Sequence, residues 1–144
     1  MFFGLVAVGG SAYLQTGTLS PLALAAAVPV GALITAILVV NNLRDIPTDR
    51  AAGKRTLAVR IGERATRWQY AVLVLGAYVV PLVIVLAGWT GPATLLAWLS
   101  LPLAVGLVRL VLAGARGPAL NPVLKRTGQL QLVFAVLFAV GLLW

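Results

Sequence analysis

The sequence contains no cysteine and no histidine, and only three of its 144 residues are acidic. Without cysteine, the chain can form no disulfide, no thiolate metal site and no catalytic thiol. Without histidine, it lacks the most common general base and metal ligand of proteins. Any metal bound by this chain must therefore be a hard cation, such as Mg²⁺, held by oxygen atoms of Asp, Glu or Asn.

Charge of either sign is scarce, since 10% of the residues are charged and 61% are hydrophobic. Soluble domains carry about 25% charged residues, and the mean hydropathy here is +1.04. The composition predicts an all-α integral membrane protein that lies in the lipid bilayer. The net charge of +8 fits the excess of basic residues that orients membrane proteins, so we expect no nucleic-acid partner.

The hydrophobic runs predict about five transmembrane helices, at residues 2–14, 21–40, 68–89, 93–112 and 128–144. A helix needs about 20 residues to cross a bilayer. The first run is shorter than this, and we interpret it as a span whose upstream part is missing. Pro29 and Pro81 lie inside predicted spans, where proline favours a kink.

All charged residues fall around two of the four connections between these spans. The connection after the second span holds seven basic residues and all three acids. The end of the fourth span and the connection after it hold the other four basic residues. Five spans place both connections on one side, which the positive-inside bias makes cytoplasmic. We therefore predict a multi-pass protein of the cell membrane, with residues 1–144 as one partial membrane domain and 41–67 as a cytoplasmic aspartate-rich loop.

The segment N-N-L-R-D-I-P-T-D-R-A-A-G-K-R-T-L-A-V-R-I-G, residues 41–62, concentrates this charge. Asn41, Asp45 and Asp49 are four residues apart, so on a continuous helix they share a face. Pro47 disfavours helix in the residue before it and has no N–H to donate. We therefore expect the helix to end near Asp45, with Asp49 just beyond a bend, and the oxygens to converge at the end of the bundle.

Two carboxylates without histidine or cysteine suit Mg²⁺, which typically uses one or two carboxylates together with substrate phosphates. Arg50, Lys54 and Arg55 follow closely, and such cations bind phosphate oxygens. The segment thus predicts a Mg²⁺-diphosphate site in which Asp45 and Asp49 hold the metal. The simpler alternatives are salt bridges between these acids and neighbouring arginines.

Other polar residues have simpler interpretations. Asn41 and Asn42 can equally cap the end of a span. Arg60, Arg64 and Arg67 fit topology determinants or lipid-headgroup contacts. Tyr70 and Tyr78 are expected at the interface or in packing, and Asn121 with Pro122 is expected to form a turn.

The segment resembles the second aspartate-rich motif of the UbiA superfamily of intramembrane aromatic prenyltransferases. Asp45, Asp49, Gly53 and Thr56 fill its D-x-x-x-D-x-x-x-G-x-x-T frame. The fuller pattern N-N-x-R-D-x-x-T-D-x-x-A-G-K-x-T-L is similar to the branch that prenylates 1,4-dihydroxy-2-naphthoate. The stretches F-F-G-L-V-A-V and A-L-N-P-V-L are similar to that branch as well, so the resemblance extends over essentially the whole chain.

This resemblance implies a nine-helix bundle in which two aspartate-rich motifs bind Mg²⁺ and a polyprenyl diphosphate. It implies that diphosphate leaves, that the naphthoate ring attacks the allylic cation, and that CO₂ is lost to give demethylmenaquinone in menaquinone biosynthesis. By position, Asp45 and Asp49 become the catalytic, metal-binding acids. The residues implied to help bind diphosphate are Asn41 or Asn42, Lys54 and Arg55.

The first aspartate-rich motif of the superfamily is absent, and three acids cannot supply a second cluster. We therefore expect the chain to correspond to the C-terminal half of such an enzyme, to have little transferase activity alone, and to have the missing N-terminal half as a candidate partner. Three alternatives stay open: another aromatic prenyltransferase of the superfamily, a transporter or channel segment, and a non-catalytic membrane fragment.

Overall fold

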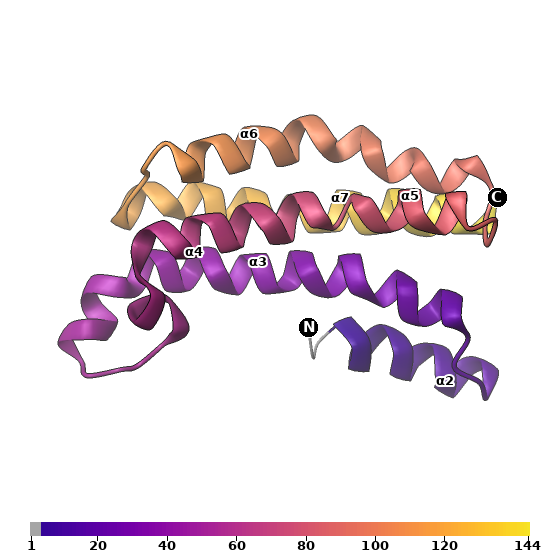
Figure 1. The fold of residues 1–144 in the computed structure, drawn as a ribbon, viewed down its shortest axis with the longest axis horizontal. Helices are drawn as coiled ribbons and strands as arrows, with labels where there is room; N and C mark the ends of the chain where they lie inside the picture. Colours follow the sequence, from indigo (N-terminus) through magenta and orange to yellow (C-terminus); the bar gives the residue numbers. More distant parts are fainter. Residues whose placement is uncertain (1–3) are drawn as a thin grey trace.

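The computed structural model describes residues 4–144, and these residues form helices without a strand. A π-helical turn, η1 (Leu5–Gly9), and the short helix α2 (Gly10–Thr16) lie beside the start of the longest helix (Figure 1). The helices that follow are α3 (Pro21–Ala51), α4 (Leu57–Gly76), α5 (Val79–Leu86), η2 (Pro92–Ser100), α6 (Leu101–Leu112), η3 (Gly117–Leu120) and α7 (Asn121–Leu143).

Within residues 4–144, four helical segments are long and apolar enough to cross a membrane: Pro21–Ala51, Leu57–Leu86, Pro92–Leu112 and Gly117–Leu143. They match the second to fifth predicted spans and confirm the all-α membrane class. The first predicted span begins at residues 2 and 3, which lie outside the described residues. Its described part forms η1 and α2, which have five and seven residues.

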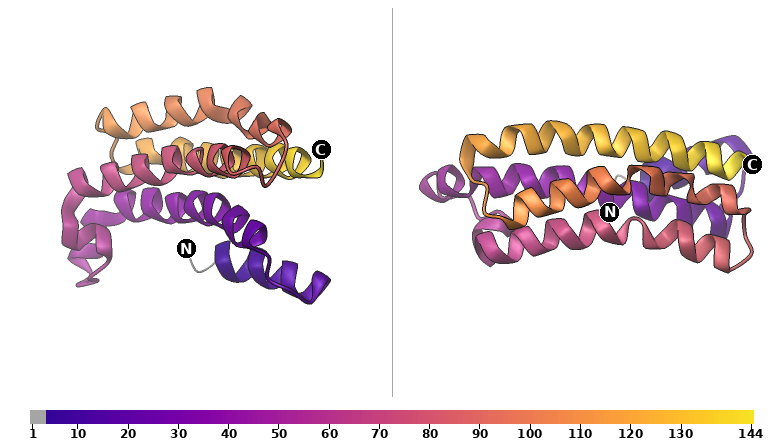
Figure 2. Two further views of the ribbon diagram at one scale, coloured as in Figure 1. Left: turned by 45° about the vertical axis from the view of Figure 1, so that its right-hand side comes forward. Right: turned by 90° about the horizontal axis from the view of Figure 1, so that it is seen from above.

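Both charged connections lie at the same end of the bundle, as predicted. The turns at 52–56 and 113–116 are at the left in Figure 1, and the uncharged turns at 17–20 and 87–91 are at the right. Figure 2 shows the same arrangement from two further directions. A contact links the two charged connections, because Arg116 Nε donates to Glu63 Oε2 at 2.9 Å.

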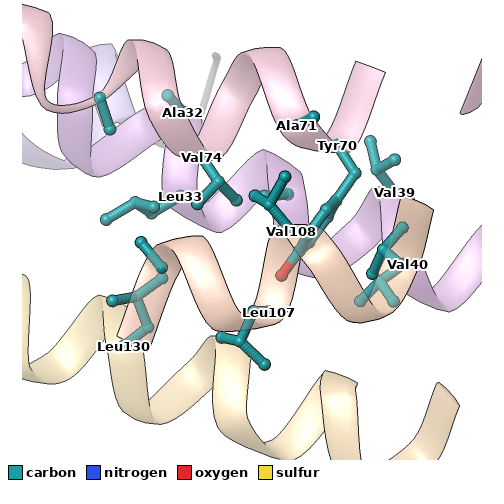
Figure 3. Close-up of a cluster of buried hydrophobic side chains, with 14 of the residues drawn as sticks. Ala32, Leu33, Val39, Val40, Tyr70, Ala71, Val74, Leu107, Val108 and Leu130 are labelled. Atoms are coloured by element: carbon teal, nitrogen blue, oxygen red, sulfur yellow. The ribbon is translucent and has the colours of Figure 1, made fainter. Parts of the chain in front are cut away.

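The hydrophobic core lies where α3, α4, α6 and α7 meet (Figure 3). Leu33 on α3, Val74 on α4 and Leu130 on α7 are completely buried, and Leu107 on α6 is almost so. Large apolar side chains also cover the outer surface of the helices, where Val72 is 68% exposed. An apolar surface of this kind is stable in lipid, which is as hydrophobic as the side chains themselves.

The third predicted span is broken close to Pro81, as expected. α4 ends at Gly76 and α5 begins at Val79. Proline has no N–H, and its ring clashes with the carbonyl four residues earlier, which here is that of Ala77. The carbonyl of Tyr78, within the break, accepts a hydrogen bond of 3.1 Å from Trp98 Nε1. A neighbouring helix thus satisfies a backbone group at the interruption, as membrane helices require.

The prediction that the helix ends near Asp45 is wrong, because α3 continues through Pro47 to Ala51. Of the segment 41–67, which was expected to be a loop, residues 52–56 are outside helices, and Gly62, with φ 81° and ψ 170°, kinks α4. Pro47 removes one intrahelical hydrogen bond, but Leu43 and Ile46 beside it are 4% and 3% exposed. Their packing against the bundle keeps the last turns of α3 helical, since tertiary burial supplies most helix stability in proteins.

Candidate functional site

The last two turns of α3 and the turn that follows bring the predicted acids together with one predicted cation. Asp45 and Asp49 lie one helical turn apart, so their side chains leave neighbouring parts of the helix surface. Gly53 has a φ of +71°, a left-handed conformation that glycine adopts without steric cost. The N–H of Lys54 donates to the carbonyl of Asp49 at 2.9 Å, and its Nζ lies 3.6 Å from Asp49 Oδ1.

Arg44 binds both carboxylate oxygens of Asp45. Its Nε lies 2.8 Å from Oδ1, and its Nη2 lies 2.9 Å from Oδ2. Asn41, one turn earlier, accepts from Arg44 Nη2 at 3.0 Å and donates to Asp45 Oδ2 at 3.4 Å. Two parallel charge-assisted hydrogen bonds are the strong form of an arginine–carboxylate pair, so Asp45 is held in a defined orientation.

The remaining nitrogen of this guanidinium reaches the last helix. Arg44 Nη1 donates to Asn121 Oδ1, at the start of α7, at 3.0 Å. The two helix ends border a hollow of about 390 Å³ at the charged end of the bundle. Its lining residues are Arg44, Asp45, Pro47, Thr48, Gly117, Pro118 and Asn121.

Asp49 has a different environment from Asp45. The residue is 9% exposed, and its partner Lys54 has a side chain that is 67% exposed. The contact of 3.6 Å is longer than a charge-assisted hydrogen bond of about 2.8 Å. Because the Lys54 side chain is largely exposed, this long contact is a weak one, and another cation that approaches the buried Asp49 carboxylate can take the place of Lys54.

The other predicted diphosphate-binding residues do not contact these acids. Arg50 and Arg55 are exposed, and within the described part of the chain no salt bridge is formed by either one. Asn42 lines a second hollow, of about 200 Å³, between α3 and α4. Thr56 Oγ1 accepts from the N–H of Val59 at 3.4 Å and caps α4, which explains the hydroxyl at this position of the motif.

A second charged cluster, around Arg67, lies at the same end of the bundle. The side chain of Arg67 is 9% exposed and lies 3.6 Å from Glu63 Oε2. Its guanidinium donates to the carbonyl of Val111, and also to that of Ala115 at 2.9 Å. Carbonyls at the end of a helix lack intrahelical donors, so Arg67 caps α6 and ties it to α4. This role is more specific than the topology function suggested by the sequence.

The site offers hard oxygen donors and positive charge, and no soft ligand. Asp45 and Asp49 supply carboxylate oxygens, and Asn41 supplies an amide oxygen. Among residues 4–144 there is no group of three or more Asp, Glu, His or Cys side chains. Mg²⁺ retains water and combines one or two carboxylates with substrate phosphates, so this donor set fits Mg²⁺ bound together with a phosphorylated ligand.

Arg44 and Asn121 are the site residues that the sequence analysis missed. Arg44 directly precedes Asp45, and its position inside the quoted motif was a signal that could have identified it. Asn121 lies 77 residues from Arg44 and was interpreted as part of a turn. No local pattern indicates this contact, because it depends on how α3 packs beside α7.

The fold and the site define a helical membrane protein with paired carboxylates and cations at one end of its bundle. The chain belongs to the UbiA prenyltransferase family, whose sequence model matches residues 1–124. No solved structure matches the chain.

Several relatives share the name 1,4-dihydroxy-2-naphthoate octaprenyltransferase, three of them as follows. The protein of Mycobacterium tuberculosis is 44% identical over 96% of this chain and 47% of its own length. That of Mycobacterium leprae is 41% identical over 96% of this chain and 46% of its own length. That of Escherichia coli is 40% identical over 99% of this chain and 46% of its own length. The chain therefore spans about half the length of the curated relatives it matches.

Proposed function

We propose that this chain acts in the transfer of a polyprenyl group from polyprenyl diphosphate to 1,4-dihydroxy-2-naphthoate. The products are the quinol form of demethylmenaquinone, CO₂ and diphosphate, and the pathway is menaquinone biosynthesis. The observation that carries the proposal is the placement of Asp45 and Asp49 one turn apart at the charged end of a membrane bundle, each beside a cation. The names of the relatives supply the octaprenyl donor and the naphthoate acceptor.

In this proposal, Asp45 and Asp49 hold Mg²⁺ and are the catalytic acids. Arg50, Lys54 and Arg55 bind diphosphate oxygens, and Asn41 and Asn42 assist with their amide groups. The charged end lies on the cytoplasmic side of the cell membrane, and the excess of basic residues at that end supports this orientation. The prenyl chain of the donor then lies among apolar helices, while its diphosphate stays at the membrane surface.

The chemistry needs stabilisation of a leaving diphosphate. Bound Mg²⁺ would neutralise the negative charge that develops on the leaving oxygens. Lys54, Arg50 and Arg55 place further positive charge near the same oxygens, and preorganised charge of this kind is a large contribution to catalysis. The carbon–oxygen bond of the donor breaks, the naphthoate ring attacks the allylic carbon, and the ring carboxyl group leaves as CO₂.

The test uses a chimera in which this chain replaces the matching segment of the E. coli relative. Membranes containing the chimera are incubated with radiolabelled polyprenyl diphosphate and 1,4-dihydroxy-2-naphthoate, and the prenylated product is separated and counted. We expect transfer that requires Mg²⁺, and we expect its loss in Asp45→Ala and Asp49→Ala chimeras.

A direct binding measurement accompanies this assay. The purified 144-residue chain in detergent is titrated with diphosphate, with and without Mg²⁺, and the heat of binding is recorded. Binding that depends on Mg²⁺ and on Asp49 supports the proposal. Diphosphate binding that is indifferent to Mg²⁺ and to both aspartates contradicts it, as does a folded chimera without transferase activity.

A further inference from the structure

The guanidinium of Arg44 makes four hydrogen bonds to three residues, and these join two helices. On its own helix, α3, it donates to both oxygens of Asp45, at 2.8 and 2.9 Å, and to Asn41 at 3.0 Å. On α7 it reaches Asn121 at 3.0 Å. All of these partners are amide or carboxylate oxygens, and the side chains of Arg44 and Asp45 are 28% and 30% exposed.

This arrangement places a positive charge against both carboxylate oxygens of Asp45, one of the residues that line the hollow. A metal ion ligated by those oxygens meets the guanidinium at close range, and like charges at such distances repel strongly. The helix does not depend on the contact between Arg44 and Asp45, because the burial of Leu43 and Ile46 stabilises this part of α3. The pair can therefore open without unfolding the helix.

We propose that Arg44 is a latch: it and a divalent cation compete for Asp45, and Asn121 of α7 holds Arg44 in the closed position. The inference rests on the proposed function insofar as Asp45 is a metal ligand. When a divalent cation binds Asp45, Arg44 leaves the carboxylate, and the link between α3 and α7 through Asn121 is broken. The released guanidinium stands at the hollow, where its planar donors suit a phosphate group.

The test measures Mn²⁺ alone, without diphosphate, as a paramagnetic substitute for Mg²⁺. The purified chain in detergent is titrated, and free Mn²⁺ is quantified by electron paramagnetic resonance. Arg44→Gln removes the competing cation, and we expect it to tighten Mn²⁺ binding roughly three- to fivefold, in line with the modest strength of partly exposed ion pairs. Arg64→Gln is the matched control, because Arg64 is exposed and its loss changes the net charge equally.

Asn121→Ala separates the latch from a general effect of charge. This variant changes no charge and removes no contact to Asp45. It therefore affects Mn²⁺ binding through the loss of the hydrogen bond that Asn121 accepts from Arg44. We expect it to tighten Mn²⁺ binding about twofold. Arg44→Lys keeps the charge, but lysine has no planar guanidinium to bind both oxygens of Asp45. We therefore expect its Mn²⁺ affinity to lie between that of the unmodified chain and that of Arg44→Gln. Circular dichroism establishes that each variant is folded.

Equal effects of Arg44→Gln and Arg64→Gln overturn the latch in favour of a simple field effect. An Asn121→Ala variant with unchanged Mn²⁺ affinity overturns the role of α7. Mn²⁺ binding that survives unchanged in Asp45→Asn overturns the metal site of the proposed function, and the latch with it. The latch alone fails if Asp45→Asn weakens Mn²⁺ binding while Arg44→Gln leaves it unchanged.

Discussion

Tyr70 on α4 and Thr127 on α7 share a buried hydrogen bond, with 2.8 Å between their hydroxyl oxygens. The Thr127 hydroxyl also donates to the carbonyl of Val123 at 2.8 Å, so Tyr70 is the donor between the two side chains. We expect Tyr70→Phe to destabilise the bundle by about 0.6 kcal/mol, the average for such bonds between membrane helices. Thr127→Val leaves the Tyr70 hydroxyl without its acceptor and is expected to cost about 1–2 kcal/mol.

Unfolding in mixed micelles, followed by circular dichroism, gives both free energies. Tyr13→Phe is the control, since Tyr13 is 53% exposed. The ranking is contradicted if Thr127→Val is no more destabilising than Tyr70→Phe.

Replacement of Arg67 by Met tests the cap on α6. The variant removes the donor for the carbonyls of Val111 and Ala115 and leaves Glu63 with Arg116 alone. Removing one partner of a buried ion pair typically costs about 3–5 kcal/mol, and we expect the lower part of this range because the side chain of Glu63 is 36% exposed. The free energy of unfolding is compared with that of Arg64→Met, and equal values for the two variants would rule out the cap.

Gly141 tests the close approach of α7 to η2. A Cβ atom at this position would lie 2.3 Å from the carbonyl oxygen of Ala93, so Gly141→Ala must push the two helices apart. We expect a loss of about 1–3 kcal/mol in the free energy of unfolding. Gly128 on the same helix has no atom within 4 Å of its would-be Cβ, and Gly128→Ala is expected to be neutral or stabilising by up to about 1 kcal/mol.

The two aspartates are tested separately for metal-dependent diphosphate binding. Asp45→Asn and Asp49→Asn keep the size of each side chain and remove its charge. Each is expected to weaken binding by about tenfold or more, because even mutation of a residue that only supports a metal ligand typically lowers metal affinity by about tenfold. Glu63→Gln makes the same change of charge at a carboxylate paired with Arg67 and Arg116 instead. Calorimetric titration with diphosphate and Mg²⁺ gives the affinities. If Glu63→Gln lowers the affinity as much as the aspartate variants do, the binding is not specific to Asp45 and Asp49.

The membrane class and the gathering of charge at one end of the bundle followed from local properties of the sequence. Hydropathy identified the four spanning segments, because burial in lipid demands long apolar runs whatever their partners are. The spacing of Asp45 and Asp49 indicated a shared face only if the helix continued through both residues, and α3 does continue through them. The helix end expected near Asp45 was wrong because a local rule about Pro47 was outweighed by the packing of Leu43 and Ile46.

The sequence by itself determined where the four spanning helices of residues 4–144 lie, and which end of them carries the charge. Only the tertiary structure decided what each charge contacts. Arg44 meets Asn121 across 77 residues, and Arg67 meets Val111 across 44. Hydropathy and helical periodicity report how one segment meets its surroundings, whereas a contact between two helices depends on their rotation and depth in the bundle, which are set by the packing of all the helices together.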